Sequence, residues 1–181
     1  DLTGLAGDAL RVFASGLLNG TPGFGLFAAL SNGTVIELPL SPVARVQLIH
    51  NSPDPTVDIY ANGDLLVDDL AYFSATPFVF IPAGNKVNIG VALDNSLSVD
   101  DTLVNIQANL LNEGTYVMVA NGIVGDPNTP FELRIQGNAR EVASDTNKTE
   151  LSVFHGASDA PAIDIDAVFV ANNAVTNLSY G

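Results

Sequence analysis

The chain contains no cysteine and no tryptophan, and only 6 of its 181 residues are lysine or arginine. Without cysteine there can be no disulfide framework, no thiolate metal ligand and no thiol nucleophile. Without tryptophan, an exposed aromatic platform for sugar binding is poorly supported, because the tyrosines and phenylalanines mostly lie in runs that resemble core. These absences exclude thiol enzymes and cysteine-based metal sites.

Basic charge is scarce as well. The 20 acidic residues give a formal net charge of −14. This charge argues against nucleic acid and anionic lipid as partners, because both are bound through a basic patch that the sequence lacks. No apolar run reaches the length of about 20 residues that a membrane-spanning helix needs, so no membrane insertion is predicted. The acidity is interpreted as a solvated surface that keeps the protein soluble.

The sequence does contain short runs rich in Val, Ile, Leu, Phe and Thr, separated by clusters of Gly, Asn, Asp and Pro. Strands spaced in this way are typical of a sandwich or barrel. The Asn-Gly pairs at 32–33 and 62–63 predict tight hairpin turns, and no convincing helix is predicted. The predicted strands are Leu10–Ser15, Phe24–Leu30, Thr34–Leu38, Ala44–His50, Val57–Ala61, Leu65–Val67, Phe78–Ile81, Lys86–Leu93, Leu103–Ala108, Tyr116–Ala120, Phe131–Gln136, Leu151–His155 and Ala162–Asp166.

An internal repeat is the most informative feature of the chain. A phrase that begins at His50 returns at His155 (155 − 50 = 105), and its second aspartate, Asp58, returns as Asp164 (164 − 58 = 106). A second pair of like segments is Leu10–Gly16 and Tyr116–Gly122, at an offset of 122 − 16 = 106. A period of about 105 residues is the size of a small β-sandwich domain.

The repeat sets the expected domain boundaries. Residues 43–144 form one complete unit, residues 1–42 match the end of that unit, and residues 145–181 match its beginning. Half a sandwich exposes its sheet edges and its core, so we expect both end pieces to need partners. Three arrangements remain open. The chain is an excerpt of a longer array, its two ends pair within one chain, or the tail of one subunit completes the head of the next in a filament.

The phrase from His50 to Gly63 resembles the extracellular domain known as domain of unknown function 4397. The resemblance continues through Leu70, Phe73, Pro82-Ala83-Gly84 and Tyr116–Gly122. It implies tandem antiparallel β-sandwiches of immunoglobulin-like or transthyretin-like form, exported to the surface of bacterial or archaeal cells, and no known reaction. The second copy departs from the pattern: Asp166 stands where Tyr60 stood, and the Asn-Gly turn is missing.

The recurring phrase allows a catalytic or metal-binding interpretation, since a histidine beside carboxylates can act as a base or a ligand. The only two histidines lie about one domain length apart, and a zinc site would therefore need Asp54 and Asp58 as partners. We favour a structural turn in which Pro53 presets the backbone and Asp54 accepts backbone N–H bonds. The predicted turn residues are His50, Pro53, Asp54, Asp58, His155, Asp159 and Asp164.

An acidic stretch between two predicted strands offers oxygen ligands at the short spacing that calcium prefers. It lacks the glycine and the distal glutamate of an EF-hand loop, and an acidic surface loop is the alternative interpretation. The candidate calcium ligands are Asp94, Asn95, Ser96, Ser98, Asp100 and Asp101. Asn-x-Ser/Thr triplets make N-glycosylation possible at Asn19, Asn32, Asn147 and Asn177.

No sequence motif for catalysis is found. Asp68 and Asp69 are a carboxylate pair, but neighbours on a strand point to opposite faces and so are not expected to act together. The sequence therefore predicts a non-enzymatic structural or adhesive module of an exported cell-surface or filament protein. Its expected partners are copies of the same module, no cofactor is expected beyond possible calcium, and the alternative is an extracellular glycan- or calcium-binding module.

Overall fold

The computed structural model describes residues 9–38, 41–167 and 171–181, except for the side chains of residues 171–173. The chain divides into two compact units, Asp1–Ser41 and Pro42–Gly181, which are treated separately below. Residues 1–8 and 39–40 of the predicted first unit lie outside the described residues. The described chain consists of strands, turns and one 3-10 helix, so the all-β prediction is confirmed.

The first unit is a single three-stranded antiparallel sheet. Its strands β1 (Arg11–Ser15), β2 (Gly25–Ala29) and β3 (Val35–Leu38) are arranged in the order β1-β2-β3. The Asn32-Gly33 turn joins β2 to β3, and the Asn32 side chain accepts a hydrogen bond from the Thr34 amide at 2.9 Å. No second layer covers this sheet among residues 9–38. Every residue of β1 is consequently exposed, including Val12, of which 60% is accessible.

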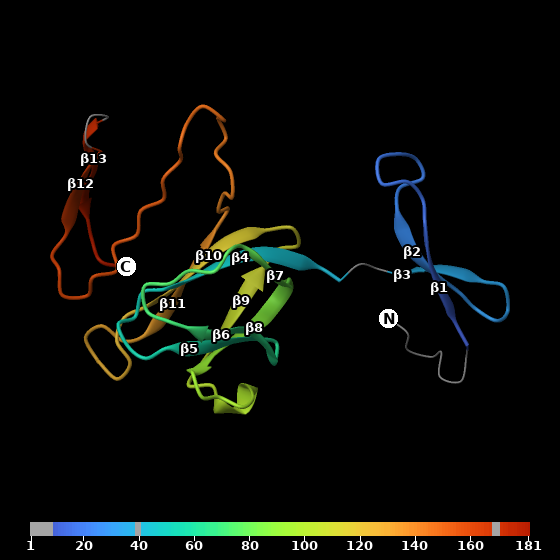
Figure 1. Ribbon diagram of the computed structural model, residues 1–181, viewed down its shortest axis with the longest axis horizontal. Helices are drawn as coiled ribbons and strands as arrows, with labels where there is room; N and C mark the ends of the chain where they lie inside the picture. Colours follow the sequence, from blue (N-terminus) through green and yellow to red (C-terminus); the bar gives the residue numbers. More distant parts are fainter. Residues whose placement is uncertain (1–8, 39–40, 168–170) are drawn as a thin grey trace. The chain divides into compact units, whose positions relative to one another are not determined.

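The second unit contains two four-stranded sheets that form its central body, residues 43–137 (Figure 1). The first sheet has the order β11-β10-β4-β7 and the second β6-β5-β8-β9. The strands of this body are β4 (Val43–His50), β5 (Val57–Ala61), β6 (Asp64–Leu70), β7 (Val79–Pro82), β8 (Gly84–Leu93), β9 (Val104–Leu110), β10 (Thr115–Asn121) and β11 (Glu132–Gly137).

One strand pair of the central body is parallel. Residues Arg45–His50 of β4 lie beside Thr115–Ala120 of β10 in parallel register, whereas the other strand pairs of both sheets are antiparallel. The antiparallel prediction therefore describes most of the fold but not this pair. The parallel arrangement brings the carboxyl ends of β4 and β10 together, and the recurring His50 phrase begins at this edge.

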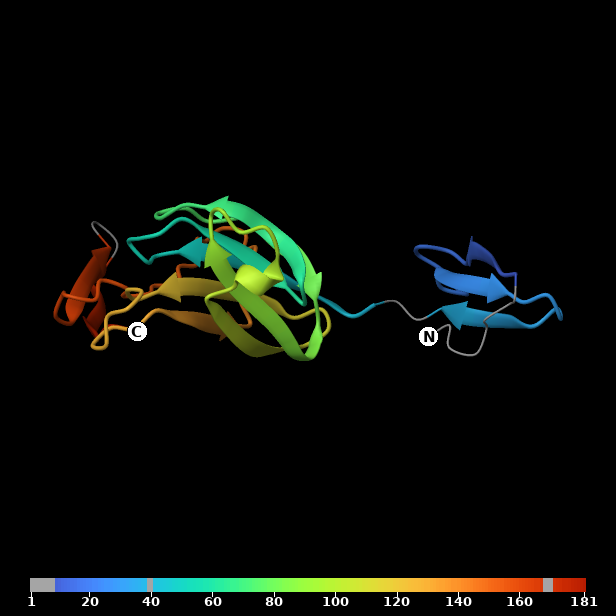
Figure 2. The same cartoon turned by 90° about the horizontal axis from the view of Figure 1, so that it is seen from below.

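The two sheets enclose one shared core (Figure 2). Burial alternates along β4, where Ala44, Val46 and Leu48 face inward, as the two-residue period of a strand requires. Ile59 and Ile89 of the other sheet belong to the same buried cluster. The remaining core residues are Val57, Ala61, Leu70, Ile81, Val87, Val91, Ala108, Leu110, Tyr116, Met118, Ala120 and Leu133.

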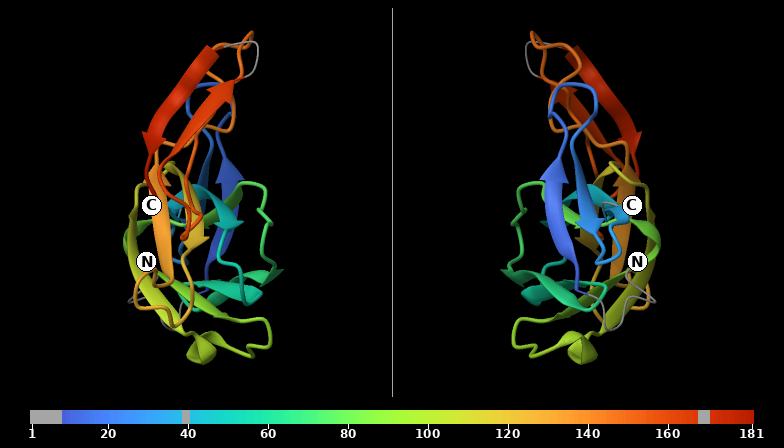
Figure 3. Two further views of the ribbon diagram at one scale, coloured as in Figure 1. Left: turned by 90° about the vertical axis from the view of Figure 1, so that its left-hand side faces the viewer. Right: turned by 90° about the vertical axis from the view of Figure 1, so that its right-hand side faces the viewer.

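The chain ends in a two-stranded antiparallel ribbon formed by β12 (Ile163–Ala167) and β13 (Ala171–Leu178) (Figure 3). Strand β13 was not predicted, because its sequence is rich in Asn and Ala rather than in β-branched residues. The predicted strand Leu151–His155 is wrong. A strand is defined by its hydrogen-bonded neighbour, and this segment pairs with no strand in the described part of the chain.

Candidate functional site

The turn after β4 is built around His50, which is 1% exposed. Its Nδ1 accepts a hydrogen bond from the Ser52 amide at 3.3 Å, which assigns the ring proton to Nε2. Nε2 then donates to the carbonyl oxygen of Pro55 at 2.8 Å. Both ring nitrogens are therefore used by the backbone of one turn. This geometry favours the structural interpretation over a metal-ligand role.

The acceptor that closes this turn differs from the predicted one. Pro53 and Asp54 are exposed, and among the described residues the Asp54 carboxylate accepts no hydrogen bond. The Pro55 carbonyl serves instead, because it lies within reach of the buried imidazole. The expected capping by Asp54 is thus corrected. A proline follows each histidine by five or six residues, but a proline does not mark its own carbonyl oxygen as the acceptor.

The second copy of the phrase makes the same contacts. The Nδ1 of His155 accepts from the Ala157 amide at 3.4 Å, and its Nε2 lies 3.0 Å from the Pro161 carbonyl oxygen. His155 is buried, whereas Asp159 and Asp164 are exposed. The imidazole-centred turn therefore forms even where Ser-Pro-Asp is replaced by Ala-Ser-Asp.

A second shared contact links the aspartate of each phrase to the following strand. Asp58 accepts a hydrogen bond from the Asp69 amide at 2.9 Å, and Asp164 accepts one from the Asn177 amide at 2.7 Å. Asp69 and Asn177 have left-handed backbones, with φ of 53° and 52°. Asp and Asn tolerate this conformation better than most residues. Sequence reasoning named both residues but did not predict this contact for either of them.

The two turns also contact each other. The Asn51 amide donates to Asn121 Oδ1 and to the Gly156 carbonyl oxygen, each at 3.0 Å, and the Asn121 amide donates to the Tyr180 hydroxyl at 3.0 Å. Asn51 and Gly156 occupy the same position of the repeated phrase. A Cβ on Gly156 would lie 2.0 Å from Asn51 Nδ2, so the contact depends on the substitution of glycine for asparagine in the second copy.

Three carboxylates meet on the other sheet. One oxygen from each of Asp58, Asp68 and Asp69 lies within 4.8 Å of the others. The expectation that Asp68 and Asp69 point apart is wrong, because the β5–β6 register shifts beside them and Asp69 is left-handed. The negative charge of Asp69 raises the pKa of Asp68, and desolvation and Asp58 raise it further.

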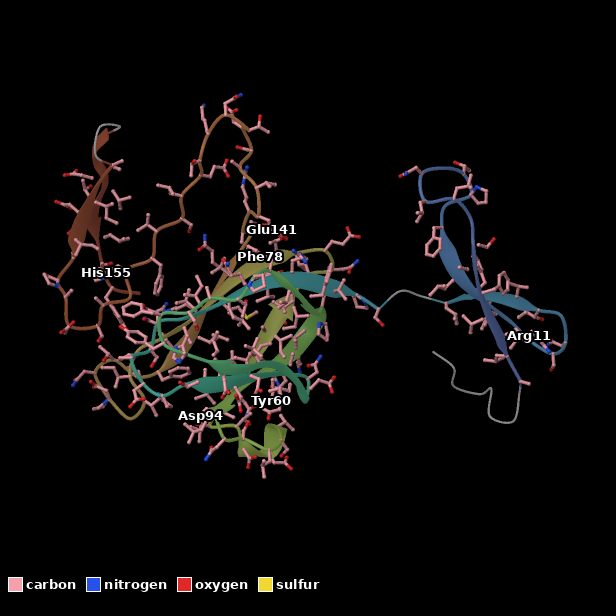
Figure 4. The ribbon with its side chains drawn as sticks, in the orientation of Figure 1. Arg11, Tyr60, Phe78, Asp94, Glu141 and His155 are labelled. Carbon is pink, nitrogen blue, oxygen red and sulfur yellow. The ribbon has the colours of Figure 1, made fainter. Side chains whose placement is uncertain are left out.

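Neighbouring hydroxyl groups hold the buried member of this carboxylate cluster in place. Asp58 is 1% exposed, its Oδ2 accepts a hydrogen bond from the Ser96 hydroxyl at 2.5 Å, and the Tyr60 hydroxyl lies 2.8 Å from Ser96 Oγ. In Figure 4, Tyr60 and Asp94 lie on one side of the central body, with Phe78 and Glu141 on the other. Carboxylate and hydroxyl oxygens of this kind are the ligands that calcium prefers.

The predicted calcium loop has a different geometry. Ser98 and Asp101 cap the 3-10 helix η1 (Val99–Asp101): Asp101 accepts from the Leu97 and Ser98 amides at 2.8 and 3.1 Å, and Ser98 Oγ accepts from the Asp100 amide at 3.2 Å. Ser96 is directed to Asp58. Asp94, Asn95 and Asp100 are exposed, and within the described residues the six candidates form no convergent group of carboxylates.

A cavity of about 360 Å³ lies on the outer face of the first sheet, beneath residues 138–152. Gln47, Val117 and Gln136 form its floor, while Arg140 and Glu150 contribute from the covering segment. Arg45 holds this segment through Glu141, with Nε and Oε1 separated by 2.8 Å, and this hydrogen bond lowers the pKa of Glu141.

The candidate glycosylation sites are all exposed. Asn19 and Asn147 lie in turns, Asn32 in the β2–β3 turn, and Asn177 at the end of β13. The Asn147 amide group donates to Asp145 at 3.3 Å. Exposure makes each triplet accessible to modification, which remains a prediction.

These sites define an all-β module whose recurring phrase builds a turn around a buried histidine. The family model for the domain of unknown function DUF4397 matches residues 44–166, more than half of the chain, and the chain belongs to this family. No curated protein matches it. Among the described residues, no helix has the length and apolar character that crossing a membrane would require.

Proposed function

We propose that the chain is a non-enzymatic structural or adhesive module of an exported cell-surface or filament protein. In this proposal the central body is an immunoglobulin-like or transthyretin-like sandwich, and the two end pieces are parts of like sandwiches in a tandem array. The modules act by stacking end on end. The first unit and residues 145–181 then belong to neighbouring modules of the kind predicted from the repeat.

One observation carries the proposal. The second copy of the phrase reproduces the contacts of the first, and its turn is seated on the first turn through the Asn51–Gly156 and Asn121–Tyr180 hydrogen bonds. Residues of the repeated phrase thus serve a turn and a contact between turns. The histidine contacts also support a non-enzymatic role, because both ring nitrogens of each histidine are hydrogen-bonded to the backbone.

Sedimentation velocity over a range of protein concentrations, combined with electron microscopy, tests the stacking function. We expect the mass to rise with concentration and elongated assemblies to form. A glycan-binding screen under the same conditions is the control for the alternative function. A protein that stays monomeric at every concentration and binds a defined glycan would contradict the proposal.

The carboxylate cluster favours calcium binding as a second candidate function. Asp58, Asp68 and Asp69 supply oxygen atoms within 4.8 Å of one another, and each positive charge brought there relieves their mutual repulsion. Calorimetric titration with calcium chloride tests it. Asp68→Asn should abolish the heat of binding, while Asp94→Asn, in the acidic loop, should leave it unchanged. The reverse pattern would assign the ion to the loop.

A further inference from the structure

Two segments of the described chain have backbone groups with no strand beside them. Strand β1 is hydrogen-bonded to β2 along one edge, and its other edge has no strand beside it among the described residues. Residues Leu151–Phe154 form no backbone hydrogen bond with any strand of the described chain. Free edges and unpaired extended segments are favourable sites for pairing with another chain.

The central body shows what normally lies beside a strand such as β1. Ala120 of β10 is paired with Leu133 of β11, and Ala14 of β1 is paired with Leu26 of β2, so the two hairpins share one register at an offset of 106 to 107 residues. In the central body, the edge of β10 that faces away from β11 is paired with the parallel strand β4. Strand β1 is therefore a β10-type strand without its β4-type neighbour.

Residues 151–155 have the character of the missing strand. They end at His155, as β4 ends at His50, and both histidines make the same turn contacts. Leu151 and Val153 stand where β4 has Val46 and Leu48. The two β4 residues are 0% and 2% exposed, but Leu151 and Val153 are 79% and 40% exposed. Their apolar side chains are left without the cover that a completed sheet would supply.

We propose that residues 151–155 of one chain lie parallel to β1 of a second copy. The β4–β10 register, transferred by the repeat, places Ser152 opposite Arg11, Val153 opposite Val12, and His155 opposite Ala14. Val153 then lies on the same face of the extended sheet as the exposed Val12. Strand β12, which follows in the same chain, would begin the second layer that the sheet of the first unit lacks among residues 9–38. This inference rests on the proposed stacking function and names the surface through which stacking occurs.

The geometry of the second unit favours a second copy over the same chain. The connection to residues 9–38 leaves from the Val43 end of β4, whereas Gly156 is held at the opposite end by Asn51. The 8 residues of β4 separate these points by roughly 25 Å at about 3.3 Å per residue. Pairing within one chain would have to bridge this separation, whereas pairing between copies needs no such reach and leaves the Asn51 and Asn121 contacts intact.

Disulfide trapping tests the register directly, because the native chain has no cysteine. Arg11→Cys and Ser152→Cys are introduced into separate full-length chains of different mass, which are mixed and oxidised. Both positions are exposed. Neighbouring strands lie about 4.8 Å apart, within the Cα separation that a disulfide tolerates. We expect a cross-linked heterodimer, with peptide mapping locating the bond between positions 11 and 152.

The matched control replaces Ser152→Cys by Val153→Cys. A shift of one residue turns the thiol to the opposite face of the sheet, so cross-linking with Arg11→Cys should fall several-fold. Circular dichroism checks that each variant is folded. Equal cross-linking in both mixtures would overturn the register, and an intramolecular bond in the Arg11→Cys/Ser152→Cys double variant would overturn the second copy as partner.

Sedimentation of the same samples distinguishes two kinds of failure. Association of the unmodified chain without the 11–152 bond would overturn the strand pairing while leaving the stacking function in place. Absence of both association and cross-linking would overturn the stacking function and the inference together.

Discussion

The Nε2 of His50 lies 2.8 Å from the carbonyl oxygen of Pro55 across a turn whose core is closed to solvent. The bond fixes the proton on the nitrogen that faces the backbone and leaves Nδ1 to accept the Ser52 amide. The histidine therefore acts as a bridge between two parts of one loop. Its conservation in the second copy as His155 has the same geometric cause.

His50→Ala should lower the free energy of unfolding of the central body by about 3 kcal/mol, because the buried Ser52 amide and the partly buried Pro55 carbonyl each lose their partner. Urea unfolding followed by circular dichroism measures the change. His155→Ala is the matched control: it removes the same bonds outside the central body and should barely shift the main transition. Equal losses in the two variants would show that both turns unfold as one unit.

Gly122→Ala should destabilise the protein far more than Gly63→Ala. Both glycines have positive φ, 81° and 100°, so each substitution carries a backbone cost of about 1 kcal/mol. A Cβ at position 122 would also lie 2.2 Å from the Pro130 carbonyl oxygen, whereas a Cβ at position 63 would have no described atom within 4 Å apart from those of its own and the two adjacent residues. Thermal melting of the two variants compares the costs. Similar melting temperatures would contradict the close approach at Gly122.

Asp68→Asn should stabilise the protein at neutral pH. The pKa of Asp68 is raised above its ordinary value of 3.8, chiefly by Asp69, so the folded state holds this proton more tightly than the unfolded state does. The stability that this proton contributes is complete below the ordinary value and is lost as the pH rises through the raised one. Asp68→Asn has no such proton to lose. The free energy of unfolding of the variant should therefore exceed that of the native chain by an amount that grows as the pH rises from 3.8 through the raised pKa.

Urea midpoints measured from acidic to neutral pH follow this effect. Asp64→Asn, on the same strand but outside the carboxylate cluster, controls for the removal of one negative charge. If both variants gain equally at every pH, general charge repulsion explains the result and the cluster has no special role. If calcium binds at this cluster, a saturating concentration should reduce the difference in urea midpoint between the native chain and Asp68→Asn.

Much of the fold follows from patterns within a few residues. The apolar run that contains Val46 and Leu48 predicts β4, and Asn62-Gly63 predicts the turn between β5 and β6. The convergence of Asp68 with Asp58 could not be predicted, because it depends on a register shift and on the left-handed Asp69. Leu151–His155 has the composition of a strand, but a strand also requires a neighbour, which composition does not encode.

The role of the Pro55 carbonyl oxygen as the hydrogen-bond acceptor of the His50 turn was not predicted, for a related reason. Side-chain acceptors such as Asp54 can be read from a sequence, whereas a backbone acceptor is available at every residue and only the path of the loop selects one. Residues that touch across the repeat, such as Asn51 and Gly156, are likewise selected by how two turns meet. Local strands and tight turns were therefore predictable, whereas backbone acceptors and contacts between distant segments were not.

Association between copies should strengthen as sodium chloride rises from about 20 mM to about 500 mM. Each chain carries a formal net charge of −14, and salt shortens the range of the resulting repulsion from roughly 20 Å to about 4 Å. The pairing of β1 with residues 151–155 buries mainly apolar groups, so screening removes an opposing force without weakening the contact. Sedimentation equilibrium measures the dissociation constant at each salt concentration.

Val12→Lys provides the decisive comparison for this salt effect. A lysine on β1 would place a charge inside the proposed contact, where it must lose its water, and association should disappear at both salt concentrations. Leu97→Lys adds the same charge at a side chain that is 94% exposed and far along the sequence from either strand, so its salt response should match that of the native chain. Association that weakens with salt would instead indicate ion pairs at the contact and argue against an apolar strand pairing.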